Sequence, residues 1–383
     1  MTTTFCAYPW DILDDPGVFD RVRRAGATGV AIAAAYHSVR AATPLHPGHM
    51  VIDAAESALY IDRAPHIWTG STLLPQTDTP WTGSDAFGRA AELSRRAGLR
   101  VEAWVVLTHS TQVGRRHPDH AAVNAWGEMY PYALCPTSPA VRDYATRLIR
   151  SVRDRFAVDG LMIEACGPMG LGHVGRHEKT AGADWTETAQ NLLSICFCGW
   201  CQAAYQRAGI DTERVRADVV NGVRAEAEGK HGEVESHVRE AQGVLAVRTH
   251  SRRELLRNVL ASCAGVERTV FHADPEPWST GPFAALFDDA DDMHGIVVPA
   301  HRLADGGAHD LRARLNGSRL GGYLMGLPPM EPASIRTQWP ALIEGLDDVY
   351  LYHLGLLSQP RLDAVGHAVT TAGHGRRAST ATF

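Results

Sequence analysis

Short runs of apolar and β-branched residues alternate along this chain with segments whose apolar residues recur at helical spacing. In one such segment, Val141, Tyr144, Leu148 and Val152 share one face of a predicted helix. Eight short runs are typical of strands: residues 4–10, 28–38, 100–110, 159–167, 267–278, 294–301, 319–329 and 347–357. Most of the intervals between them are long enough for a helix. Eight β–α repeats predict an α/β fold, a (β/α)8 TIM barrel.

The alternative architecture is a doubly wound sheet with a second domain. Neither of the glycine-rich phosphate loops, GxGxxG or GxxxxGK[ST], follows a predicted strand, and this weakens the nucleotide-binding alternative. We therefore expect a single barrel domain over residues 1–383. A long insertion after the fourth strand, residues 167–260, carries a cysteine cluster and helices.

Composition narrows the class of protein. The chain is 45% hydrophobic and 21% charged, with a formal net charge of −6, as in a globular protein with a large core. We expect no nucleic-acid partner, because no dense stripe of Lys and Arg is present. No run approaches the ~20 apolar residues of a membrane span, and the N-terminus does not read as a signal peptide. The expected location is cytoplasmic, and homo-oligomerisation is left open.

Active sites of such barrels lie at the carboxyl ends of the strands. Side chains at these ends are polar, aromatic and rich in histidine, as in a pocket for a sugar-like or other polar small molecule. The predicted substrate-binding residues are Trp10, Asp11, Tyr36, His37, Trp104, His109, His272 and His353.

Histidines near the strand ends also raise the alternative of a second, catalytic metal, which would favour metal-assisted isomerisation, epimerisation or hydrolysis. The chain has no HxH or HExxH spacing to support it. The histidines concerned are His37, His109, His272, His301 and His353.

The segment "CFCGWC" places Cys196, Cys198 and Cys201 within six positions. Three thiols this close favour a metal site, and a fourth would complete tetrahedral zinc coordination. Cys135 is the best candidate for the fourth ligand and Cys166 its rival. A redox pair and a set of inert buried thiols are the alternatives.

The segments "LCPTSPAVRDY" and "CFCGWC", with a glutamate at the end of strand four between them, resemble the β-galactosidases of glycoside hydrolase family 42. The resemblance covers roughly residues 100–205. It implies that Glu164 is the general acid/base. It also implies a structural Zn²⁺ held by Cys135, Cys196, Cys198 and Cys201. The segments "AYPWDI", "AAAYHS" and "VDGLMIEACG" also resemble uncharacterised, alanine-rich, glycosidase-like barrel proteins of actinobacteria.

The chain departs from the family 42 pattern at two places. Ile163 precedes Glu164 where the family has asparagine, and strand seven offers Met325 where the family has a nucleophilic glutamate. The second carboxylate is therefore sought among Asp11, after strand one, Asp274 and Glu276, after strand five, and Glu331, beyond strand seven. Asp274 and Glu331 are the favoured candidates.

The resulting hypothesis is a glycosidase that acts on a glycoside or sugar-derived small molecule by general acid/base catalysis. The apolar run before Glu164 favours a raised pKa, as a proton donor requires. A non-hydrolytic lyase, isomerase or epimerase on the same barrel is the first alternative, and a catalytically inactive carbohydrate-binding barrel is the second.

Overall fold

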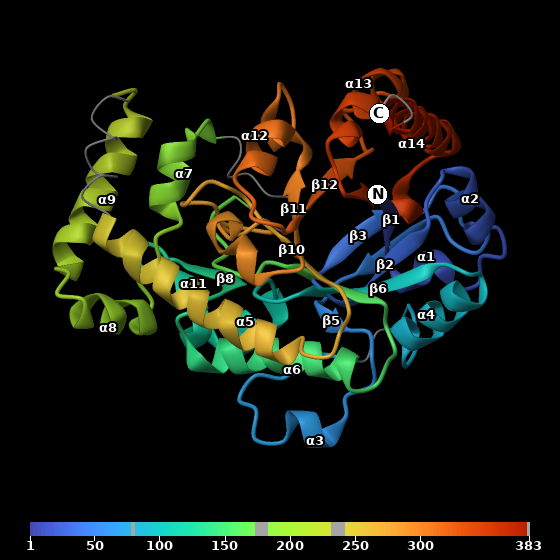
Figure 1. The fold of residues 1–383 in the computed structure, drawn as a ribbon. Coiled ribbons are helices and arrows are strands. Elements are labelled where there is room, and N and C mark those ends of the chain that lie inside the picture. The colour runs from blue at the N-terminus through green and yellow to red at the C-terminus, as the bar shows by residue number, and fades with distance from the viewer. Residues whose placement is uncertain (78–80, 173–182, 231–241, 381–383) are drawn as a thin grey trace.

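Eight parallel strands form the centre of the molecule, with helices around them (Figure 1). The protein is described by a computed structural model over residues 1–77, 81–172, 183–230 and 242–380. The barrel strands are β1 (Thr2–Ala7), β2 (Gly29–Tyr36), β6 (Arg100–Val106), β9 (Gly160–Glu164), β10 (Thr269–His272), β11 (Gly295–Pro299), β12 (Arg319–Met325) and β13 (Asp348–Tyr352). Each strand pairs with the next one in this series, and β1 pairs with both β2 and β13, which closes the barrel. The predicted (β/α)8 fold is confirmed, and each predicted strand segment overlaps one barrel strand.

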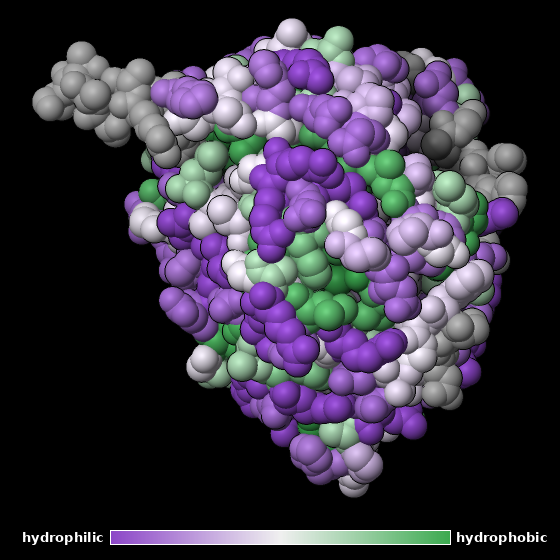
Figure 2. Space-filling model, turned by 90° about the vertical axis from the view of Figure 1, so that its right-hand side faces the viewer, coloured by the Kyte–Doolittle hydropathy of each residue, from purple (hydrophilic) through white to green (hydrophobic). Residues whose placement is uncertain are grey.

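Amphipathic helices cover the outside of the barrel. In α6, for example, Val141, Tyr144, Leu148 and Val152 are buried, as their spacing predicts. On the face formed by α2, α4 and α14, hydrophilic residues surround a central area of apolar ones (Figure 2). The helices of this layer are α2 (Val18–Arg24), α4 (Ala86–Arg96), α6 (Pro139–Arg153), α11 (Gln242–Ser262), α12 (Gly307–Ala313), α13 (Pro332–Glu344) and α14 (Gln359–Thr380), with the 3-10 turns η3 (Phe287–Asp292), η4 (Ala300–Arg302) and η5 (Leu354–Leu356). The short helix α1 (Pro9–Ile12) directly follows β1 and is buried throughout.

Two connections at the carboxyl end of the barrel carry extra structure. After β2, the strands β3 (Val39–Ala42) and β4 (Val51–Ala54) form a hairpin. Strand β5 (Ala58–Leu59) then pairs with β2, and the short helix α3 (Pro65–Trp68) follows. The connection after β6 consists of α5 (Thr111–Arg116), η1 (Pro118–His120) and the hairpin of β7 (Ala121–Val123) with β8 (Met129–Leu134).

The connection between β9 and β10 contains α7 (Glu187–Leu193), α8 (Gly199–Arg207) and α9 (Thr212–Ala227), followed by α11. These helices lie on the side of the molecule away from β1 and β2 (Figure 1). They enclose a second apolar core that includes Phe197, Tyr205, Val219 and Trp278. This segment coincides with the predicted insertion, of which residues 173–182 and 231–241 lie outside the described residues.

A network of buried charged side chains fills the amino end of the barrel. Arg268 pairs with Glu102 at 3.1 Å and with Asp348 at 2.6 Å, and Tyr350 donates to Glu102 at 2.7 Å. The Arg319 and Arg268 guanidinium groups and the Thr2 hydroxyl help to hold the pKa of Asp348 below its usual range, although burial acts in the opposite direction. Gly160 leaves room for this network, because a Cβ there would lie 3.2 Å from Cγ of Glu102.

In the part of the chain that the structure describes, no helix has both the length and the apolar composition that a bilayer crossing requires.

Replacing Asp348 with asparagine should destabilise the fold by roughly 3–5 kcal/mol, because it removes the carboxylate that Arg268 and Arg319 share and leaves Arg268 with Glu102 alone. Urea unfolding of the variant and the wild type measures the difference. Glu92→Gln is the matched control. Its ion pairs with Arg95 and Arg96 lie at the surface, so it should cost less than about 1 kcal/mol. Equal effects of the two substitutions would contradict a role for the network in closing the barrel.

Candidate active site

Glu164 is the last residue of β9 and lies inside the carboxyl end of the barrel, 4% exposed. Its Oε2 accepts a hydrogen bond of 2.8 Å from the indole Nε1 of Trp104. Val106 is the register partner of Glu164 in β6, and Trp104 lies two residues earlier on the same side of that strand. The tryptophan therefore reaches the carboxylate from one layer below.

Burial raises the pKa of Glu164 to about 7, against the smaller opposing effect of the Trp104 hydrogen bond. A carboxyl group with this pKa keeps its proton over much of the neutral range and can still release it. This is the property that general acid catalysis requires.

His272, the last residue of β10, lies beside Glu164. Its Nδ1 is 3.7 Å from Oε2 of the glutamate, and its ring stacks on Phe283 with centroids 4.6 Å apart. Burial lowers the pKa of His272 to about 3, so the imidazole is neutral at pH 7. Within the described residues, neither ring nitrogen has a hydrogen-bond partner.

Three tyrosines surround the indole of Trp104. The Tyr8 and Tyr352 hydroxyls are 3.4 Å apart, and Tyr36 packs edge-on against Trp104 with centroids 4.6 Å apart. Burial raises the pKa of all three phenols, so each keeps its proton. The carboxyl end of the barrel therefore places neutral hydroxyl groups around a carboxyl group that is about half protonated at pH 7.

A second acid lies on the opposite wall. Asp11 in α1 follows β1, and its Oδ2 is 3.5 Å from Nδ1 of His353, which follows β13. The same oxygen accepts a 2.7 Å hydrogen bond from the backbone N–H of Tyr8. Burial raises the pKa of Asp11 to about 8 and lowers that of His353 to about 3.

The remaining predicted substrate-binding residues join the same aromatic cluster. Tyr36 stacks on His37 with centroids 4.1 Å apart, and His37 stacks on His109 at 4.3 Å. Trp10 stacks on Tyr8 at 4.7 Å. The structure thus brings together Glu164 and all eight predicted substrate-binding residues.

The other two predicted catalytic residues lie in different settings. Both carboxylate oxygens of Asp274 are bound by Arg302, at 2.9 and 3.1 Å, and Oδ1 also accepts from the N–H of Glu276. Glu331 is exposed at the start of α13. Met325, at the end of β12, is half exposed.

Sequence reasoning missed Tyr8, Tyr352 and Phe283. The first two lie at alternate positions after Cys6 and Tyr350, so the period-two pattern of β1 and β13, extended to the strand ends, identifies them as inward-facing. Phe283 comes from an irregular loop that carries no such pattern.

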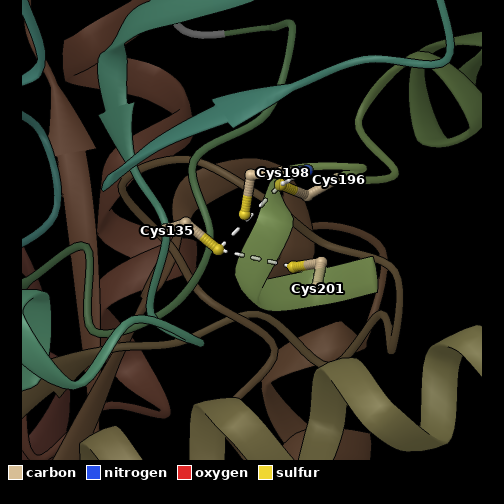
Figure 3. A group of neighbouring side chains, drawn as sticks. All are labelled: Cys135, Cys196, Cys198 and Cys201. Carbon is tan, nitrogen blue, oxygen red and sulfur yellow. Dashed lines mark hydrogen bonds between the residues drawn. The ribbon is translucent and has the colours of Figure 1, made fainter. Parts of the chain in front are cut away.

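The second site is the cysteine cluster (Figure 3). One sulfur atom each from Cys135, Cys196, Cys198 and Cys201 lies within 4.8 Å of all the others. Two of the separations are 3.5 Å, between Cys135 and Cys201, and 3.9 Å, between Cys135 and Cys196. Tetrahedral coordination with Zn–S bonds of about 2.3 Å gives sulfur separations of about 3.8 Å, so the donor set and its spacing fit a metal ion.

Backbone contacts assemble this cluster from two connections. Cys135 follows β8, and its N–H bonds to the carbonyl of His120. The N–H of Phe197 bonds to the carbonyl of Val123 in β7 at 2.7 Å, which ties the cysteine loop to the hairpin. Cys166, the rival fourth ligand, is not part of the group. No other group of three or more metal-ligating residues, including the histidines of the mouth, occurs in the described ranges.

Comparison with known proteins shows the fold and no closer relationship. No protein-family model and no curated protein matches the chain. Among solved structures, it is similar to a β-galactosidase from the psychrophilic Marinomonas ef1, with a TM-score of 0.55 and 10% identity over 99% of this chain and 60% of the other. An α-L-fucosidase isoenzyme from Paenibacillus thiaminolyticus gives a TM-score of 0.53 and 10% identity, over 98% and 50%.

A catalytic mutant of Gan42B, a β-galactosidase of glycoside hydrolase family 42 from G. stearothermophilus, gives a TM-score of 0.51 and 10% identity, over 98% of this chain and 57% of the other. The chain therefore spans about half to three fifths of the length of these proteins. Its barrel is of a kind found in glycoside hydrolases, including those of family 42.

The raised pKa of Glu164 predicts a pH-dependent stability. A carboxyl whose pKa is about 4.5 in the unfolded chain and about 7 in the folded one costs stability as pH rises between these values. Glu164→Gln removes this penalty. The free energy of unfolding of the variant, taken relative to that of the wild type, should therefore increase by roughly 2–3 kcal/mol between pH 5 and pH 8. Urea unfolding at both pH values tests this. The exposed Glu331→Gln should show no such growth, and equal behaviour of the two variants would refute the raised pKa.

Proposed function

We propose that this protein is a glycoside hydrolase-like enzyme that acts on a glycoside or a related sugar-derived molecule, with Glu164 as the proton donor. The observation that carries the proposal is the setting of Glu164. This carboxyl lies at the end of the fourth strand of a closed barrel, is buried, and has its pKa raised to about 7. The similarity to barrels of family 42 and other glycoside hydrolases supports the same reaction class.

The side chains around Glu164 fit this role. The partly buried rings of Tyr352 and Phe283 would offer apolar faces to a sugar ring, and tyrosine hydroxyls exchange hydrogen bonds with sugar hydroxyls. Glu164 donates its proton to the glycosidic oxygen as the bond to the anomeric carbon breaks. Trp104 Nε1 then stabilises the carboxylate that remains.

One observation favours a non-hydrolytic reaction as the second candidate. Glu164 and His272 form a carboxyl–imidazole pair, whereas Asp274 is held by Arg302. Such a pair can move a proton to and from one substrate carbon or oxygen without water, as in an isomerase or epimerase.

Turnover of a panel of activated aryl glycosides tests the first proposal. Glu164→Gln should lower kcat on a substrate with a poor leaving group by about 10²–10⁴-fold, and much less on one with a good leaving group, which needs no proton. Glu331→Gln is the control and should retain wild-type rates. In H2 18O, a hydrolase places the label in the sugar product. Turnover without incorporated label would replace the hydrolase proposal with the isomerase or lyase alternative.

The cysteine cluster is proposed to hold a structural Zn²⁺. Four thiol donors suit zinc, and no ligand position is left for substrate once all four bind. The ion would join the end of β8 to the start of α8, two segments of the chain 61 residues apart at Cys135 and Cys196.

Elemental analysis of the purified protein should find about one zinc per chain. Cys198→Ser should lower the metal content and the unfolding temperature. Cys263→Ser alters a buried thiol that is not part of the cluster and should keep the metal. Zinc retained in full by Cys198→Ser would refute the site. Folded, metal-free protein that keeps its activity would show that the ion takes no part in the reaction.

A further inference from the structure

The wall of the barrel mouth opposite Glu164 holds a second carboxyl–imidazole pair. In the closed series of strands, β13 and β1 lie four positions from β9 and β10. His353 directly follows β13, and Asp11 lies in α1 after β1. Glu164 is the last residue of β9, and His272 is the last residue of β10. The pair Asp11–His353 therefore faces Glu164 across the barrel.

His353 is directed into the aromatic cluster of the mouth. Its ring lies 4.1 Å from that of Tyr8 and 6.2 Å from that of Trp104, the residue that binds Glu164. The imidazole is fully buried, and among the residues that the structure describes neither of its nitrogens has a hydrogen-bond partner. An unsatisfied buried imidazole costs stability, so its retention in this position favours a functional partner.

Asp11 is the polar side chain that lies next to the imidazole. Its Oδ2 lies 3.5 Å from Nδ1 of His353 and is fixed by the N–H of Tyr8. Gly355 packs over the other oxygen, and a Cβ at this glycine would lie 1.9 Å from Oδ1. One oxygen of the Asp11 carboxyl group therefore lies beside His353, and Gly355 covers the other oxygen. We expect Asp11 to influence a substrate only by positioning the histidine.

We infer that His353, positioned by Asp11, is the proton acceptor that works opposite Glu164. The inference rests on the proposed glycoside hydrolysis and supplies the second group that this reaction needs. In the step, the oxygen of a water molecule bonds to the anomeric carbon, and the water proton passes to Nε2 of His353. The bond to the leaving oxygen breaks, and that oxygen takes the proton of Glu164. The configuration of the anomeric carbon is inverted.

The protonation states set the pH dependence. His353 would accept at Nε2 once Asp11 is ionised, so activity should rise as this pair loses a proton and fall as Glu164 loses its own. Because burial raises the pKa of Asp11 to about 8 and that of Glu164 to about 7, the productive form is a minor one that is most populated between these two pH values. The titratable and charged groups around the pair are Tyr8, Tyr352, Asp15 and Arg21. The last two form an ion pair, so their effects on Asp11 oppose each other.

The experiment measures kcat against pH with the full-length protein and the best aryl glycoside of the panel. His353→Gln should lower kcat by about 100-fold and remove the low-pH limb, while the high-pH limb set by Glu164 remains. Asp11→Asn should remove the same limb with a smaller loss. His250→Gln changes an exposed histidine on α11 and should match wild type in rate and profile.

The anomer released by the wild type is a second readout that needs no variant. Nuclear magnetic resonance of the fresh product should show inversion. A retained anomer, or an unchanged low-pH limb in folded His353→Gln, would overturn the role of His353 while leaving glycoside hydrolysis intact. A wild-type protein that turns over no glycoside would overturn both proposals.

Discussion

The hydrogen bond from Trp104 to Glu164 is the contact on which the position and protonation of this carboxyl group depend. It fixes one oxygen of the carboxyl group inside a ring of aromatic side chains, where water cannot stabilise a negative charge. The indole donor alone offsets only part of this penalty, so about half of the Glu164 carboxyl groups keep their proton at pH 7. A cationic side chain in the place of the indole would have produced a permanently ionised glutamate.

Buried carboxyl groups have different partners at the two ends of the barrel. At the amino end, Glu102 and Asp348 are paired with Arg268, and their charges hold the strands together. At the carboxyl end, Asp274 is also paired with an arginine, Arg302, but Glu164 and Asp11 lie beside neutral imidazoles. The same strands supply both ends: β6 carries Glu102 and then Trp104, and β13 carries Asp348 before His353 follows it. In β6 and β13, the residues that stabilise the barrel thus lie near the amino end of the strand, and the residues of the candidate site lie at or beyond its carboxyl end.

The sequence predicts those features of the fold and of the candidate site that depend on the spacing of residues within one short segment. Period-two and helical spacing locate the strands and helices, and the rule that barrel sites lie at strand ends selects Trp104, Glu164 and His272. The thiol spacing in "CFCGWC" finds the cluster. Pairings between distant segments are not encoded in local spacing. Arg302 reaches Asp274 from the following β–α connection, and the setting of Glu331 depends on where the loop after β12 leads into α13.

The insertion is linked to the candidate active site through a chain of contacts. Arg248 of α11 donates to the carbonyl of Trp278, a member of the second apolar core that encloses the cysteines. Trp278 belongs to the loop after β10, and the carbonyl of Pro282 in this loop accepts from the N–H of Ala165, the residue after Glu164. The next residue, Phe283, stacks on His272. A metal at the cysteines would therefore act on catalysis indirectly, by keeping rigid the loop that shapes the wall beside Glu164.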